Sequence, residues 1–231
     1  MRRLVQREWL DELAPGDPGA IRSRRDLQRL NAWMGNAGTV ARTLRRIFRR
    51  RKPQRLAELG AGDGKFLRGV ARRLPGDWKG VQVLLLDQLA CVPSQVAGGF
   101  KELGWRPELV QADVFEWLKG PAEPVWDVMV ANLFLHHFSE GQLAELLAGV
   151  ARRTNVFIAV EPRRSALALA GSRLCPLIGC NRVTRHDAPI SVRAGFAGRE
   201  LSGLWPAATG WSPEERSAGL FSHLFVAKRR S

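Results

Sequence analysis

Between residues 55 and 160, short apolar runs alternate with segments whose apolar residues recur at helical spacing. The runs predict strands at 56–59, 81–86, 109–112, 128–131 and 156–160. The intervening patterns predict helices at 66–74, 92–103, 115–118 and 143–150. Strands that alternate with helices in this way are typical of a parallel sheet covered by helices on both faces.

The segment before residue 55 predicts helices instead. Ser23 and Asp26 have the spacing of a capping box, which places a helix start at Ser23. Gly35 and Gly38 interrupt the helical pattern, and a second, Arg-rich helix is expected to end before Pro53. Residues 1–54 are therefore expected to form a helical extension or cap.

Beyond the last of these strands the pattern changes twice. Residues 163–205 mix helical and irregular sequence, and 211–216 and 221–227 predict a β-hairpin. We expect residues 55–231 to form one α/β domain that carries 163–205 as an insertion.

The composition narrows the class of protein to which this α/β domain can belong. With 231 residues, 45% of them hydrophobic, the chain is long enough for a core of its own and is not low-complexity. It holds no apolar run of the roughly 18 residues that span a membrane, and the start at Met1 lacks the apolar core of a secretory signal. Three cysteines cannot all pair with one another, so a reducing, cytoplasmic location is expected.

The formal net charge of +14 is concentrated at one end of the chain. Residues 1–55 hold 15 Arg and Lys against 5 Asp and Glu, and the remaining residues hold 21 against 17. Such a segment suits nucleic acid or an anionic membrane surface. No aromatic residues of the kind that stack bases are interleaved with the charge, which favours solvated helices over nucleic-acid binding.

A glycine-rich turn follows the first predicted strand. Residues 60–64 read Gly-Ala-Gly-Asp-Gly, and such turns let a ligand approach the backbone and the free N–H groups of the next helix. Phe66 follows Gly64 and Lys65, where a phosphate-binding P-loop needs Ser or Thr. Lys65 also stands where a dinucleotide-binding turn has its third glycine, which weakens that alternative.

The turn and three later positions together resemble the class I, seven-stranded S-adenosylmethionine-dependent methyltransferases. Asp87 ends the second strand, Asp113 follows the third, and Asn132 ends the fourth. Taken alone, each of these three residues could instead be a helix cap or a turn residue. The resemblance implies a Rossmann-like three-layer sandwich with a seven-stranded, mostly parallel sheet whose last strand is antiparallel. It implies S-adenosylmethionine as cofactor, held by Glu58, Gly60, Ala61, Gly62, Asp87, Gln88, Asp113, Val114 and Asn132.

The resemblance also points to catalytic candidates after the fourth and fifth strands. His137 is the preferred general base and His136 the alternative, while Glu161 is a candidate for orienting the acceptor or the histidine. A helix cap or a turn would equally explain each of the three. Cys175, Cys180 and His186 are too loosely spaced for a zinc site, so no metal is expected.

The expected acceptor is a small hydrophobic molecule, phenolic or quinone-like and typical of secondary metabolism, methylated at oxygen or carbon. The resemblance puts residues 1–54 and 163–205 over its pocket. The Asn-Pro-Pro-aromatic motif of amino-methylating relatives is absent after Ala131, and the chain contains no Pro-Cys pair of the RNA cytosine-carbon type. An RNA methyltransferase that uses the basic segment, and a non-enzymatic homologue, remain alternatives; peripheral membrane contact stays open.

Overall fold

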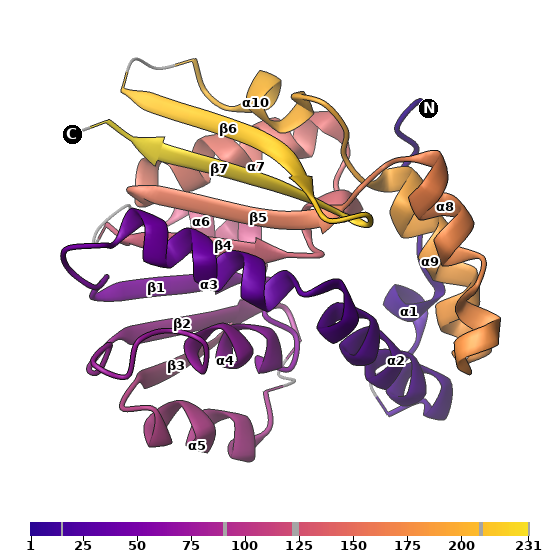
Figure 1. The fold of residues 1–231 in the computed structure, drawn as a ribbon, viewed down its shortest axis with the longest axis horizontal. Helices are drawn as coiled ribbons and strands as arrows, with labels where there is room; N and C mark the ends of the chain where they lie inside the picture. Colours follow the sequence, from indigo (N-terminus) through magenta and orange to yellow (C-terminus); the bar gives the residue numbers. More distant parts are fainter. Residues whose placement is uncertain (15, 90–91, 122–124, 208–209, 231) are drawn as a thin grey trace.

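One seven-stranded sheet organises the chain (Figure 1). The computed structural model describes residues 1–14, 16–89, 92–121, 125–207 and 210–230. The strand order is β3-β2-β1-β4-β5-β7-β6; β1 to β5 pair in parallel, and β7 lies antiparallel between β5 and β6. The strands are β1 Arg55–Leu59, β2 Gln82–Asp87, β3 Arg106–Gln111, β4 Val128–Asn132, β5 Val156–Pro162, β6 Trp211–Ala218 and β7 Ser222–Arg229. This confirms the expected Rossmann-like fold and its hairpin.

The predicted strands are confirmed, with one shift. β3 begins at Arg106 rather than at residue 109. It is the edge strand of the sheet and most of its residues are exposed, so polar residues such as Glu108 belong to it and hide its start in the hydrophobic pattern.

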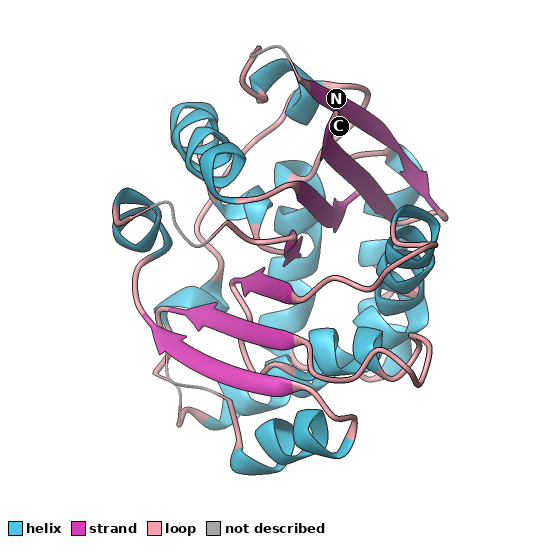
Figure 2. Cartoon of the chain, turned by 90° about the vertical axis from the view of Figure 1, so that its left-hand side faces the viewer, coloured by secondary structure: helices cyan, strands magenta, loops and turns pink. Residues whose placement is uncertain are grey.

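Helices cover both faces of the sheet (Figures 1 and 2). Alternate residues of β4 face opposite cores: Val128 and Val130 pack with α3 to α5, and Met129 and Ala131 pack with α6, α7 and α10. None of the helices in the described part of the chain combines the length and apolar character needed to cross a bilayer. The helices flanking the sheet are α3 Asn36–Ile47, α4 Lys65–Ala71, α5 Ser94–Glu102, α6 Val114–Lys119, α7 Glu140–Arg153 and α10 Glu200–Leu204.

The predicted helix start at Ser23 is wrong. Helix α2, Pro18–Met34, is capped by the Asp17 carboxylate, which accepts hydrogen bonds from the backbone N–H groups of Gly19 and Ala20. Ser23 lies inside α2 and bonds Thr184 across the protein. Gly35 ends α2 in a left-handed conformation (φ 70°), as expected, whereas the other glycine of the pattern lies within α3.

A helical cap stands beyond the carboxyl ends of the parallel strands, on the right in Figure 1. It consists of α1 Trp9–Glu12, α2, α8 Ala166–Ser172, the 3-10 turn η2 Cys175–Ile178 and α9 Arg182–Ala194. Helices α1, α2 and α8 all pack on α9, and the Asn181 N–H donates to Asp26 of α2 at 2.7 Å. The cap thus joins the amino-terminal segment to most of the 163–205 segment, while α10 packs on α7 and β6.

Candidate active site

The turn between β1 and α4 takes backbone conformations that favour glycine. Gly60, Gly62 and Gly64 have φ angles of 67°, 53° and 71°. A Cβ on Gly60 would lie 2.2 Å from the ring of Phe134, so that position also needs glycine for space. A Cβ on Gly62 would meet nothing within 4 Å. The turn therefore presents bare backbone to an open side, where a ligand has room.

This turn is bonded directly to the end of β2. The Gly62 N–H donates to Oδ2 of Asp87 at 2.8 Å, and the Ala61 N–H donates to the Leu86 carbonyl at 2.9 Å. The second oxygen of Asp87 accepts from the Leu89 N–H. Each carboxylate oxygen has two lone pairs, so Asp87 keeps acceptor capacity for a further donor such as a hydroxyl. The structure thus brings together two of the residues expected to hold the cofactor.

Glu58 lies under the turn on β1 and is almost fully buried. Burial, with the nearby charges of Asp63 and Asp87, raises the pKa of the Glu58 carboxyl well above its ordinary value. Its Oε2 has no hydrogen-bond partner among the described residues. A buried polar atom without a partner beside an open turn fits a site that a polar ligand completes.

The other residues expected at the adenosyl end lie along the same sheet edge. The Ala112 N–H donates to the Asp87 carbonyl, which joins the ends of β2 and β3. Asp113 is the N-cap residue of α6, because its Oδ1 accepts hydrogen bonds from the N–H groups of Phe115 and Glu116. The helix-cap interpretation of this residue is therefore correct. Gln88 is exposed and Val114 is buried.

At the end of β4, Asn132 is held by the amino-terminal segment. Nδ2 of Asn36 donates to Oδ1 of Asn132 at 3.0 Å, and Ser222 Oγ donates to Oδ1 of Asn36 at 2.7 Å. The next residue, Leu133, is the one non-glycine residue with positive φ (51°) in the described chain. Strained backbone of this kind gathers at functional sites because the surrounding contacts must hold it.

Glu161, at the end of β5, organises the loop that follows β4. It is completely buried, and its carboxylate accepts from the backbone N–H groups of Phe134, Leu135 and His136. Oε2 also lies 2.8 Å from Nδ1 of His136. This carboxylate therefore caps the 3-10 turn η1 Leu135–His137 and fixes the His136 ring.

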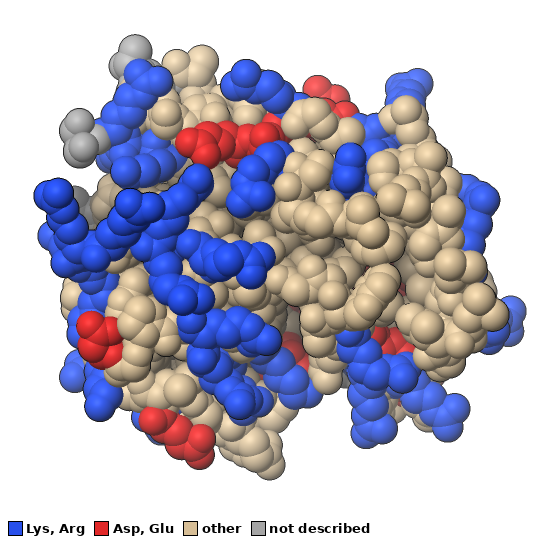
Figure 3. Space-filling model, in the orientation of Figure 1, with Lys and Arg blue, Asp and Glu red and all other residues tan. Residues whose placement is uncertain are grey.

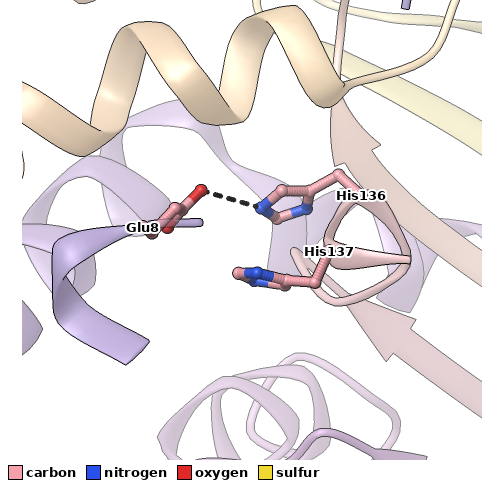
Figure 4. A group of neighbouring side chains, drawn as sticks. All are labelled: Glu8, His136 and His137. Atoms are coloured by element: carbon pink, nitrogen blue, oxygen red, sulfur yellow. Dashed lines mark ion pairs between the residues drawn. The ribbon is translucent and has the colours of Figure 1, made fainter. Parts of the chain in front are cut away.

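His136 lies between the carboxylates of Glu161 and Glu8, of which Figure 4 shows Glu8. Its Nε2 is 3.6 Å from Oε1 of Glu8, which precedes α1 in the cap. Burial alone lowers the pKa of His136, but hydrogen bonds and charge from Glu161 and Glu8 outweigh it and raise the pKa to about 9. Burial opposes ionisation of Glu8 too, yet its contacts with His136, the charge of His137 and a bond from Ser191 leave the Glu8 pKa below its ordinary value. A charged, buried ion pair results.

His137 is the accessible member of the pair. Its side chain is 30% exposed, and its ring lies 4.2 Å from the His136 ring, centroid to centroid. Nδ1 lies 3.3 Å from Oδ2 of Asp11 in α1. Glu8, His136 and His137 also bring one potential metal-ligand atom each within 4.8 Å of one another, as no other His, Cys, Asp and Glu group of three does in the described ranges.

The individual contacts of the amino-terminal segment with the site were not predictable from the sequence. Glu8 and Asp11 reach the two histidines, Asn36 reaches Asn132, and Gln28 donates to Asp63 of the glycine turn at 2.6 Å. Each contact joins residues far apart in the chain, so no local spacing could reveal it. The cap is thus bonded to both halves of the site.

The basic residues that precede β1 lie at the other end of the sheet. A cavity of about 470 Å³ there is lined by Arg46, Arg49, Arg50, Arg51, Lys228, Arg229 and Arg230 among others. Asp127 and Asn155, which precede β4 and β5, also line it. It therefore opens where the parallel strands begin, and the glycine turn lies where they end.

Comparison with known proteins identifies similar structures. No family model and no curated protein matches the chain. The plantazolicin methyltransferase BpumL, solved with S-adenosylhomocysteine, is 13% identical with a TM-score of 0.67 over 93% of this chain and 92% of that one. A Nostoc punctiforme protein described as an O-methyltransferase is 16% identical with a TM-score of 0.63, over 99% of this chain and 64% of that one. A Burkholderia thailandensis O-methyltransferase family protein is 18% identical with a TM-score of 0.59, over 93% and 61%. This chain has the Rossmann-like fold of these methyltransferases.

Proposed function

We propose that this protein transfers a methyl group from S-adenosylmethionine to a small hydrophobic acceptor, phenolic or quinone-like, at oxygen or carbon. The observation that carries the proposal is the bond from the Gly62 N–H to Asp87. It sets an open glycine turn and a carboxylate with spare acceptor capacity side by side at the carboxyl ends of parallel strands, where such sheets bind nucleotides.

The cofactor-binding role goes to the residues around this contact. Asp87 would accept hydrogen bonds from the ribose hydroxyls, and the unpartnered Glu58 would face a polar group near the turn. The full set is Glu58, Gly60, Ala61, Gly62, Asp87, Gln88, Asp113, Val114 and Asn132. When bound, the cofactor supplies a methyl carbon made electrophilic by its sulfonium.

His137 is the proposed general base. Asp11 beside Nδ1 would fix the tautomer that leaves Nε2 free to accept the acceptor's hydroxyl proton. The acceptor oxygen forms the new bond to the methyl carbon while the carbon–sulfur bond breaks and its electron pair stays on sulfur. His136 already carries a proton at neutral pH, so it and Glu161 act as positioning residues for the η1 turn.

The cap would exclude water and cover the acceptor. Its bonds to Asp63 and the two histidines bridge the cofactor end and the base end of the site, and Asn36 at the start of α3 adds the bond to Asn132. Aligning two reactants in a closed site contributes roughly 7–11 kcal/mol to lowering a barrier.

An RNA acceptor is the alternative. The basic segment motivates it. Its arginines on α2 lie in the cap, but Arg46 and Arg49 to Arg51 line the cavity at the sheet edge opposite Gly62. RNA held there would have to wrap around the domain to present a base to the methyl donor, which favours a small molecule.

A cytoplasmic location belongs to the proposal as well. Cys175 and Cys180 are both buried and free, with no disulfide between them. Buried thiols kept reduced are typical of a reducing compartment.

Calorimetry of S-adenosylmethionine binding tests the proposal. Asp87→Ala is expected to weaken binding at least about tenfold, the loss of roughly one charge-assisted hydrogen bond. Asp77→Ala, at an exposed acid away from the turn, is the matched control. Equal affinities for both variants would overturn the assignment, and binding without methyl transfer to any candidate acceptor would favour a non-enzymatic homologue.

A further inference from the structure

The cap carries a cluster of water-exposed apolar side chains. Leu177 is 80% exposed and Trp33 is 71% exposed, and four other large apolar residues of α8, η2 and the two turns beside them are more than half exposed. These others are Leu167, Leu174, Ile178 and Leu220. We name the six residues the apolar ridge. Leaving such side chains in water is unfavourable, by about 25 cal/mol for each Å² that a partner would cover.

Three parts of the chain meet at one end of the ridge, and Leu174, Leu177 and Ile178 follow α8 from there. The ring of Trp33, on α2, packs 5.2 Å from the ring of Phe221 in the β6–β7 turn, centroid to centroid. A Cβ on Gly171 of α8 would lie 2.6 Å from the same Phe221 ring, so α8 packs there too. Figure 3 shows on its right-hand side a broad area largely free of charged side chains, bordered mostly by Lys and Arg with a few acidic side chains among them.

The helices that carry most of the ridge are rich in arginine. Residues 18–34 and 163–194, which hold α2, α8, η2 and α9, contain ten Arg, no Lys and two acids. Both acids, Asp26 and Asp187, are buried and bonded internally: Asp26 pairs with Arg29 at 2.5 Å, and Asp187 accepts from the N–H groups of Trp9 and Leu10. The exposed charge of these four elements is therefore positive, from Arg22, Arg25, Arg173, Arg182 and Arg185, and the exposed acids of the cap, Asp11 and Glu12, lie on α1.

Exposed apolar side chains beside arginines favour one kind of binding partner over others. Two copies joined through the ridge would bring their arginines face to face, and like charges oppose such a contact. Nucleic acid would use the arginines but leave Leu177 and Ile178 in water. An anionic bilayer matches both features, since apolar side chains enter the acyl boundary while arginines meet lipid phosphates, each basic residue adding about 1 kcal/mol.

We propose that the cap docks on anionic lipid bilayers through the apolar ridge, with Leu177 and Ile178 inserted and the flanking arginines on the headgroups. This binding goes beyond methyl transfer and does not depend on it. It would, however, bring the active-site end of the domain to a surface from which lipid-like acceptors come.

Cosedimentation with vesicles tests the proposal. The wild-type protein is expected to bind vesicles of phosphatidylcholine with phosphatidylglycerol, and to bind phosphatidylcholine alone much more weakly. The double variant Leu177→Ser with Ile178→Ser should lose at least about tenfold in affinity, from the apolar area no longer inserted. Because both side chains are exposed, its thermal unfolding midpoint and S-adenosylmethionine affinity should stay unchanged.

A second pair of variants separates docking from general charge attraction. Arg22→Ser with Arg25→Ser should weaken vesicle binding, whereas Arg49→Ser with Arg50→Ser, the same charge change at the opposite edge, should not. Equal loss in both pairs, or no loss in the leucine–isoleucine variant, would overturn the proposal. So would a ridge-dependent dimer in light scattering without vesicle binding.

Discussion

Glu8 and His136 form a buried ion pair that bonds the cap to the loop after β4, with 3.6 Å between Oε1 and Nε2. Both side chains are less than a tenth exposed. Without Glu8 the buried His136 charge keeps only Glu161, at 2.8 Å, so the cost should stay below the roughly 3–5 kcal/mol of a buried charge left without any partner. We expect Glu8→Gln to lower the free energy of unfolding, measured in urea, while Glu12→Gln, at an exposed carboxylate of the same segment, leaves it near the wild-type value.

Stability should fall on the alkaline side because of His136. Its pKa rises from 6.5 to about 9 on folding, so the folded protein holds this proton more tightly than the unfolded chain. The resulting stabilisation is complete below about pH 6.5 and is lost as the pH rises through about 9. Urea titrations across this range should show the decline in the wild-type protein and a flatter profile in His136→Gln. The idea fails if both proteins show the same slope; His137→Gln serves as control.

His137 should affect turnover rather than cofactor binding. We expect His137→Ala to lower kcat on a phenolic acceptor by about 10²–10⁴ with S-adenosylmethionine affinity unchanged. Asp11→Asn should lower kcat less and displace the pH–rate profile, because it alters the partner of Nδ1. A kcat that survives His137→Ala would show that the transfer needs no base at this position.

Gly60 offers a test of the turn itself. Gly60 has a φ of 67°, and a Cβ added there would lie 2.2 Å from the ring of Phe134. Gly60→Ala should therefore cost about 2–4 kcal/mol of stability, or displace the loop and weaken cofactor binding. At Gly76 a Cβ meets nothing within 4 Å and no positive φ is needed, so Gly76→Ala should be tolerated. Thermal unfolding and calorimetry of S-adenosylmethionine binding compare the two variants. Equal stability and equal affinity would argue against a strained turn at Gly60.

Methyl transfer should withstand chelation. Glu8, His136 and His137 have the composition of a metal site, but a metal ion bound to His136 would have to displace a proton whose pKa Glu161 and Glu8 raise to about 9. We expect prolonged EDTA treatment to leave kcat unchanged. Loss of activity that zinc or magnesium restores would make these residues metal ligands instead.

The sheet was predictable from the sequence because its strands are buried. Val128 to Ala131 are apolar on both faces, and such runs are visible in any reading of the chain. The exposed edge strand β3 lacks that pattern, so its first three residues were missed.

Local patterns also misplaced the start of α2. Ser23 and Asp26 have capping-box spacing, but their side chains bond Thr184 and Asn181 in α9 and its cap, and Asp17 supplies the cap that begins the helix. The residues proposed to bind the cofactor could be predicted from the order of the motifs along the chain. The partners of the histidines did not, because Glu8 and Asp11 reach them only through the folded cap.

The reversed direction of β7 has a practical consequence for anyone labelling this protein. It returns the chain to the edge where the parallel strands begin, so a purification handle or fluorophore joined at the carboxyl end would project away from the glycine turn. At the other end, the Met1 carbonyl accepts a bond from Arg164, and the Arg3 guanidinium donates to the His136 and Phe138 carbonyls. A fusion at the amino end would therefore disturb the loop that carries His136 and His137, and the carboxyl end is the better place for attachment.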